Sequence, residues 1–139
     1  MYVEGWNAVG SDWYFVRNGA LVSGWEYING HWYWFDSSSG CKMATGWIEL
    51  SGSRYYLEQG GDFQGAMSTG WILDGGSWYY ADASGAVLNG WQYIGSAWYW
   101  LGTSNDGKMA TGFKQIGSST YYFDSSGAMS TGWVRDAVS

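Results

Sequence analysis

Proline is absent from this sequence, cysteine and histidine occur once each, and only 13% of the 139 residues are charged. Because Cys41 has no second cysteine to pair with, no intrachain disulfide can form, and no metal or other cofactor is expected. No apolar run reaches the ~20 residues that a membrane-spanning helix needs. The net charge of −6 argues against a phosphate-backbone ligand, which requires clustered Lys and Arg. We therefore expect neither membrane insertion nor a nucleic-acid partner.

Aromatic rings and glycines are abundant instead. Phe, Trp and Tyr make up 21% of the chain, with 12 Trp and 12 Tyr, and there are 23 Gly. One large core built from so many rings would also need aliphatic side chains, but Leu, Ile and Val are scarce. The rings are therefore expected to be distributed along the chain in some other arrangement.

Two aromatic motifs recur at a fixed separation. The first motif is a Gly followed by Trp or Phe, and it begins at Gly5, Gly24, Gly46, Gly70, Gly90, Gly112 and Gly132. Seven residues after each of the first six rings comes a three-residue cluster with Tyr at its centre. All variation in length falls between a cluster and the next Gly–ring pair. A constant part and a variable part indicate six rigid hairpins joined by tolerant loops, followed by a truncated seventh copy at Gly132.

The constant part is predicted to be a β-hairpin, because its flanks alternate with a period of two and are rich in Trp, Tyr, Phe and Ile. The expected turn residues are Gly10-Ser11, Asn29-Gly30, Gly52-Ser53, Gly76-Ser77, Gly95-Ser96 and Gly117-Ser118. Asn-Gly is a strong turn signal, since Gly supplies the positive φ that such turns require. A single hairpin is marginal in water, so we expect the hairpins to stack into an all-β solenoid. Residues 1–139 are predicted to form a single repeat domain.

Alternation along each strand predicts which side chains are interior. The central Tyr of each cluster shares a face with the residue two positions later, and this face is predicted to be interior packing. The later residues are Val16, Phe35, Leu57, Ala81, Leu101 and Phe123. The first and third cluster residues lie on the opposite face together with the ring of the Gly–ring pair. That second face is too aromatic to be left in water without a purpose.

The polar residues that could carry chemistry are assigned structural roles. Turns such as Asp82 to Gly85 and Asp124 to Gly127 can bond to their own backbone through Asp and Ser. They are not expected to bind calcium, because no loop gathers several carboxylates at ligand spacing. Catalysis is not expected either. His31 lies beside a predicted turn, Cys41 has no histidine at a suggestive position, and no acidic pair recurs across the repeats.

The succession of Gly-Trp, hairpin turn, Trp-Tyr-Tyr and Gly-x-Met-x-Thr-Gly resembles the choline-binding, or cell-wall-binding, repeats. The last element occurs at Gly65–Gly70, Gly107–Gly112 and Gly127–Gly132, and the resemblance extends from Gly5 to Trp133. Such repeats occur in surface proteins and lytic enzymes of Gram-positive bacteria and their phages. The resemblance implies a left-handed superhelix with ligand sites between successive hairpins, and choline or phosphocholine on teichoic acid as the ligand. It also implies a secreted protein at the bacterial cell surface or cell wall, or a phage lysin acting at the wall.

Carried over to this chain, the family pattern gives four complete cages, each with two Trp of one repeat and an aromatic residue of the next. They are Trp6, Trp13 and Trp34; Trp25, Trp32 and Tyr56; Trp71, Trp78 and Trp100; and Trp91, Trp98 and Tyr122. Rings suit choline because its quaternary ammonium cannot donate a hydrogen bond but is attracted to ring faces. Arg54 replaces the cluster Trp of the third repeat, and Phe113 and Thr120 replace both Trp of the sixth, so no binding is expected there. Two roles remain open for four methionines, as soft cage contacts or as gap fillers: Met43, Met67, Met109 and Met129.

The alternative ligand is a glucan or another oligosaccharide, because glucan-binding and clostridial toxin repeats also carry short aromatic motifs and sugars stack on rings. The paired Trp favour choline, whereas the sixth repeat, Phe113 to Phe123, looks like the glucan type. A third interpretation makes the rings the core of a spacer without a small-molecule ligand. We also expect the chain to be a fragment of a larger protein whose catalytic domain, if any, lies elsewhere. We also expect that the chain can self-associate through a terminal hairpin.

Overall fold

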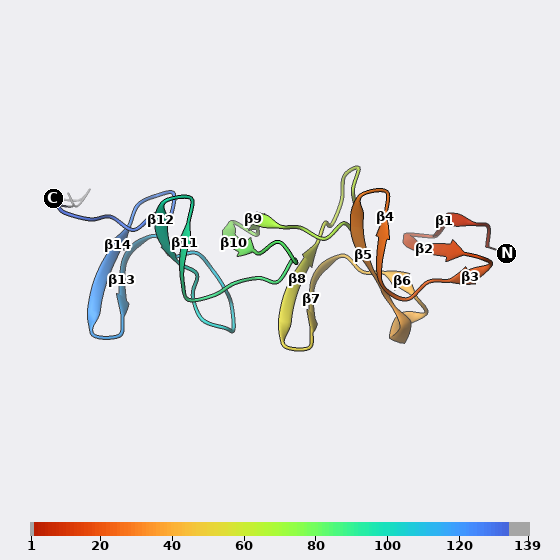
Figure 1. The fold of residues 1–139 in the computed structure, drawn as a ribbon, viewed down its shortest axis with the longest axis horizontal. Helices are drawn as coiled ribbons and strands as arrows, with labels where there is room; N and C mark the ends of the chain where they lie inside the picture. Colours follow the sequence, from red (N-terminus) through yellow and green to blue (C-terminus); the bar gives the residue numbers. More distant parts are fainter. Residues whose placement is uncertain (1, 134–139) are drawn as a thin grey trace. The chain divides into compact units, whose positions relative to one another are not determined.

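The computed structural model describes residues 2–133 and shows hairpin after hairpin along the chain (Figure 1). The hairpins, all antiparallel, are formed by β1 (Gly5–Val9) and β2 (Asp12–Arg17), β4 (Gly24–Ile28) and β5 (His31–Asp36), β7 (Gly46–Leu50) and β8 (Ser53–Leu57), β9 (Gly70–Asp74) and β10 (Ser77–Ala81), β11 (Trp91–Ile94) and β12 (Ala97–Trp100), and β13 (Gly112–Ile116) and β14 (Ser119–Phe123). Two short strands, β3 (Ala20–Leu21) and β6 (Lys42–Met43), extend the first two hairpins, and η1 (Ser37–Ser39) is a 3₁₀ turn. The predicted all-β fold of successive hairpins is confirmed.

The chain divides into two compact units, Met1–Ser68 and Thr69–Ser139. The first unit contains the first three hairpins and the second contains the other three. The single-domain organisation of residues 1–139 stays a prediction. Of the seventh copy, the structure describes Gly132 and Trp133, and the rest of that copy lies outside the described residues.

Positive backbone φ angles locate the hairpin turns. Asn29 and Gly30 have φ of 50° and 88°, as a two-residue turn with both φ positive requires. In the third and fourth hairpins the turn lies one residue earlier than expected, at Ser51-Gly52 and Gly75-Gly76, where all four φ angles are positive. The predicted pairs Gly52-Ser53 and Gly76-Ser77 are therefore wrong, because the serine that follows Gly already begins the second strand.

Hairpins within a unit stack face to face. Of the face predicted to be interior, the six residues that follow the central Tyr by two positions are at most 2% exposed: Val16, Phe35, Leu57, Ala81, Leu101 and Phe123. Of the six central Tyr, Tyr33 and Tyr79 are buried and the other four are half-buried. Trp6 of the first hairpin contacts Phe35 of the second, with ring centroids 5.9 Å apart. In the second unit, Trp91 contacts Phe123 of the next hairpin at 5.7 Å. The aromatic face of one hairpin thus covers the interior face of the next. The prediction of interior packing is confirmed for the residues two positions after the central Tyr, and among the central Tyr for Tyr33 and Tyr79.

Backbone hydrogen bonds fasten the variable part after each of three hairpins to the preceding hairpin. The N–H of Met67 donates to the carbonyl oxygen of Trp32 at 2.8 Å. Met109 donates in the same way to Trp78 at 2.9 Å, and Met129 donates to Trp98 at 2.8 Å. Each of these methionines is therefore fixed beside a cluster Trp of the neighbouring repeat.

The Asp-x-Ser turns are closed by carboxylates, as expected. The Asp124 Oδ1 accepts hydrogen bonds from the N–H groups of Ser126 and Ala128, at 2.9 and 3.0 Å, and from the Ser126 hydroxyl at 2.7 Å. The same pattern recurs at Asp82 with Ser84. The serine hydroxyl lowers the pKa of each carboxyl most, with the backbone N–H groups adding to the effect.

Between residues 2 and 133, no helix has the length and apolar character to cross a membrane. The same stretch contains no group of three or more His, Cys, Asp or Glu side chains that could hold a metal ion.

Candidate functional site

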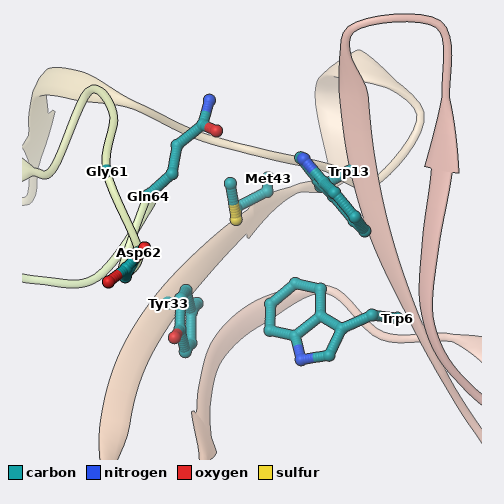
Figure 2. A pocket seen from close by; sticks show the side chains of 7 residues that line it. All are labelled: Trp6, Trp13, Tyr33, Met43, Gly61, Asp62 and Gln64. Atoms are coloured by element: carbon teal, nitrogen blue, oxygen red, sulfur yellow. The ribbon is translucent and has the colours of Figure 1, made fainter.

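A pocket in the first unit opens between two indoles of the first hairpin and parts of the two repeats that follow (Figure 2). Its lining consists of Trp6, Trp13, Tyr33, Met43, Gly61, Asp62 and Gln64. Trp6 stands nearly perpendicular to Trp13, at 86° and 6.1 Å between ring centroids, and tilts 74° to Tyr33 at 5.0 Å. Rings set edge to face leave a concave corner between them, and a corner of this kind can surround a small apolar cation.

The register of the first hairpin explains why Trp6 and Trp13 meet. Trp6 lies opposite Phe15, and Ala8 lies opposite Trp13. Residues opposite each other in an antiparallel pair project to the same face, and residues two positions apart on one strand do so as well. The two indoles therefore project from one face of the hairpin, from adjacent strands.

The second unit repeats this arrangement. A pocket there is lined by Trp71, Trp78, Tyr99, Met109 and Ser126. The two indoles are 6.5 Å apart at 88°, and Tyr99 lies 4.9 Å from Trp71 at 65°. The pockets at the first and fourth hairpins are thus lined by the same residue types: two Trp of one repeat, and one Tyr and one Met of the next.

The other two expected cages show the same ring contacts in part. Trp91 contacts Trp98 at 6.3 Å and 83°, and it contacts Tyr121 of the next hairpin at 4.9 Å. Trp25 contacts Tyr55 of the next hairpin at 5.3 Å. Trp32 lies on the same face of its hairpin as Trp25. Its carbonyl oxygen accepts a hydrogen bond from the N–H of Met67.

The aromatic residue that the next hairpin supplies differs from the expected one in all four cases. The structure places Tyr33, Tyr55, Tyr99 and Tyr121 against the Gly-Trp indoles of the preceding hairpins. The expected third rings pack across their own hairpins instead: Trp34 on Trp25 at 5.3 Å, Tyr56 on Trp47 at 4.9 Å, Trp100 on Trp91 at 5.5 Å and Tyr122 on Phe113 at 4.7 Å.

Strand alternation is the physical reason for this difference. Trp34 follows Tyr33 directly, so the two side chains project from opposite faces of the second hairpin. The face with Tyr33 and Phe35 is the one that the first hairpin covers, because Trp6 contacts both rings. Trp34 lies on the far face with Trp25. The central Tyr was predicted to be interior packing only, yet Tyr33 and Tyr99 also line the pockets.

In the first site, exposure distinguishes an accessible wall from a buried wall. The cluster Trp of the four expected cages are 37% to 43% exposed: Trp13, Trp32, Trp78 and Trp98. Tyr33 is 7% exposed, and burial raises the pKa of its phenol. A ligand of the first cage would therefore enter past Trp13 and meet the buried phenol ring of Tyr33 at the base.

Each of the two pockets combines residues from three successive repeats. Met43 and Met109 line the pockets, and Met43 also belongs to the buried core of the first unit. A glycine of the repeat that follows lies against each Met. A Cβ added at Gly65 would lie 2.3 Å from the Met43 sulfur, and one at Gly127 would lie 2.3 Å from the Met109 sulfur. The same two loops contribute Asp62 and Ser126 to the linings.

The third and sixth hairpins depart from this pattern, as the sequence indicates. The guanidinium carbon of Arg54 lies 4.5 Å from the centroid of the Trp47 ring, so this indole already faces a cation of its own chain. In the sixth hairpin Phe113 is 59% exposed, and Thr120 is also exposed.

Known proteins with similar repeats provide the comparison for this geometry. The profile of the family described as choline-binding repeat matches residues 22–63 and 110–137. A family of cell wall binding repeats matches residues 69–87 and 89–109. No curated protein sequence gives a significant match.

Solved structures of pneumococcal proteins share the fold. CbpJ from Streptococcus pneumoniae TIGR4 is 40% identical with a TM-score of 0.85, over 92% of this chain and 42% of that chain. Choline binding protein F of the same species is 38% identical with a TM-score of 0.86, over 97% of this chain and 44% of that one. The multimodular pneumococcal cell wall endolysin from phage Cp-1, solved in complex with choline, is 32% identical with a TM-score of 0.64, over 93% and 37% of the two chains.

The chain spans about two fifths of the length of CbpJ and choline binding protein F. The family matches, the identity to these structures and the recurring pairs of perpendicular indoles agree with one another. This chain belongs to the choline-binding repeat family.

Proposed function

We propose that the chain is a non-catalytic attachment module that binds the choline headgroups of cell-wall teichoic acid in four aromatic cages. The observation that carries the proposal is the recurring corner of two perpendicular indoles closed by a Tyr of the next hairpin. The proposed cages are Trp6, Trp13 and Tyr33; Trp25, Trp32 and Tyr55; Trp71, Trp78 and Tyr99; and Trp91, Trp98 and Tyr121. The relative from phage Cp-1, solved with choline, supports the ligand.

The chemistry of choline matches these walls. Its ammonium group carries three methyl groups and no N–H, so it gains from ring faces and from methyl burial and gains little from a hydrogen-bonding pocket. Each ring contributes about 0.5–2 kcal/mol, and the loss of free motion on binding offsets much of the total. A dissociation constant near millimolar, equivalent to about 4 kcal/mol, is expected for one cage.

Several cages on one chain convert weak sites into firm attachment. Teichoic acid carries many choline groups on one polymer, so engagement of one cage raises the effective concentration at the next. Avidity can then exceed the affinity of a single cage by about 10²–10⁴-fold. The net charge of −6 adds a favourable field for a cationic group. We therefore propose that the chain acts at the bacterial cell wall or surface and that any catalytic domain lies elsewhere in a longer protein.

Thermal unfolding tests the ligand class. Choline that binds only the folded state at ten times its dissociation constant should contribute about 1.4 kcal/mol per occupied site. The melting temperature is therefore expected to rise with choline and to stay constant with dextran. A rise with dextran alone would support the oligosaccharide alternative, and no rise with either would support a spacer.

Calorimetric titration of the wild-type protein with choline should give four weak sites per chain. Trp78→Ala should reduce the count to three, because it removes one wall of a cage whose other walls stay in place. Thr120→Ala is the matched control, since Thr120 occupies the equivalent position in the sixth hairpin and should leave the count at four. An unchanged count in both variants would refute the assignment of the cages.

A further inference from the structure

The first pocket has a carboxylate in its lining, whereas the lining of the fourth-hairpin pocket has Ser126 as its polar member. Asp62 and Gln64 come from the loop that follows β8 in the third repeat. Figure 2 shows them on the side of the pocket that faces the two indoles, with Met43 and Tyr33 between. A loop two repeats along the chain therefore gives the first cage a charge that its counterpart does not have.

Local contacts hold this loop in place over the pocket. The N–H of Gly65 donates to the carbonyl oxygen of Glu58 at 2.7 Å, and the N–H of Glu58 donates to Ala66 at 2.9 Å. The Phe63 ring packs on His31 of the second hairpin, with centroids 4.4 Å apart and planes inclined by 36°. In the sequence, Asp62 stands between Gly61, which also lines the pocket, and Phe63.

We infer that Asp62 is a specificity-determining residue that makes the first cage select a cationic headgroup over a neutral group of the same shape. The inference rests on the proposed choline function. The rings and Met43 contribute binding free energy through burial of methyl groups, whether or not the ligand is charged. A carboxylate adds binding free energy only for a charged ligand, because a quaternary ammonium interacts with it through Coulomb attraction alone. The first cage should therefore discriminate more strongly than the fourth-hairpin cage.

The expected effect is modest because Asp62 is exposed to solvent. Exposed charge pairs contribute up to about 1 kcal/mol, which corresponds to at most about fivefold in the dissociation constant. The contribution should also fade in salt, since the screening length shortens to about 3 Å at 1 M. Ring contacts do not depend on salt in this way, so salt separates the carboxylate from the cage walls.

Indole N–H resonances of the 15N-labelled chain read the cages one at a time. Trp6 and Trp13 report on the first cage, and Trp71 and Trp78 report on the fourth-hairpin cage in the same molecule. Wild type and Asp62→Asn are titrated with choline and with 3,3-dimethylbutan-1-ol, its neutral carbon analogue, at low and high salt. Glu49→Gln removes the same charge at an exposed residue outside the pocket lining and is the matched control.

Asp62→Asn should weaken choline binding at the first cage about threefold at low salt. Binding of the neutral analogue, the fourth-hairpin cage and the Glu49→Gln variant should be unchanged, and the difference should disappear at high salt. Equal choline affinity in wild type and Asp62→Asn would overturn the role of Asp62 while choline binding itself stands. Absence of choline-dependent shifts at all indoles of the wild type would instead overturn the proposed function.

Discussion

The two neighbouring rings Tyr99 and Trp100 offer a sharp test of how the cages are built. Tyr99 lies 4.9 Å from Trp71 and lines the pocket of the fourth hairpin. Trp100 projects from the opposite face and packs on Trp91 at 5.5 Å. Tyr99→Leu should therefore weaken the Trp71 and Trp78 cage. Trp100→Leu should leave that cage intact and act on the cage that contains Trp91.

The structure sets the size of the effect. A ring in contact with the bound cation contributes about 0.5–2 kcal/mol, so its loss should raise the dissociation constant about twofold to thirtyfold. Trp100 packs on Trp91 from the adjacent strand of the same hairpin and should act indirectly, through the position of that indole. Leu retains apolar volume at both positions, which limits the loss of packing.

Indole resonances again resolve the two cages, with Trp71 and Trp78 reporting on one and Trp98 on the other. Urea unfolding of each variant gives the free energy of unfolding and shows whether the native state is retained at the titration temperature. Weakened choline binding at Trp71 and Trp78 in Trp100→Leu, combined with unchanged binding there in Tyr99→Leu, would refute the stacking argument. That result would restore Trp100 as the third ring.

Two further predictions concern stability. Gly127→Ala should lower the free energy of unfolding by about 1–3 kcal/mol more than Gly117→Ala in urea titrations, because both have positive φ but only the Cβ at 127 meets Met109. Equal losses would show that the methionine moves aside freely. The lowered pKa values of Asp82 and Asp124 predict stabilisation that is present above about pH 4 and lost as the pH falls through the folded-state pKa. The free energy of unfolding, measured from about pH 6 to pH 2, should decline less steeply in the Asp82→Asn, Asp124→Asn double variant, and identical slopes would contradict this.

The repeats, the hairpins and the interior face could be predicted because they depend on short-range patterns. The constant seven-residue separation fixes the two aromatic strands on either side of a turn. A side-chain period of two then assigns Phe35 and its equivalents to one face. The turns at residues 51–52 and 75–76 were missed because Ser51 and Gly75 also adopt positive φ, which the Gly-Ser pattern does not reveal.

The third ring of each cage depends on which face of the next hairpin is covered. Alternation separates Tyr33 from Trp34 but does not say which of them meets Trp6, since both faces carry rings. The contact of Trp6 with Phe35 decides it, and that contact belongs to the stacking of two hairpins. Asp62 was missed for a related reason. Its loop is irregular and reaches a pocket whose indoles lie more than forty residues earlier in the chain.

The interlocking of three repeats in one pocket limits how such an array can change by recombination. The pocket of the fourth hairpin takes indoles from one repeat, Tyr99 and Met109 from the next, and Ser126 from the one after. A single repeat that is exchanged, inserted or deleted therefore alters up to three neighbouring sites at once. The Trp pair of the exchanged repeat can stay unchanged while a pocket two repeats earlier in the chain loses the loop residue that lines it. A complete ligand site is therefore inherited only with three consecutive repeats, although the sequence pattern recurs in every single repeat.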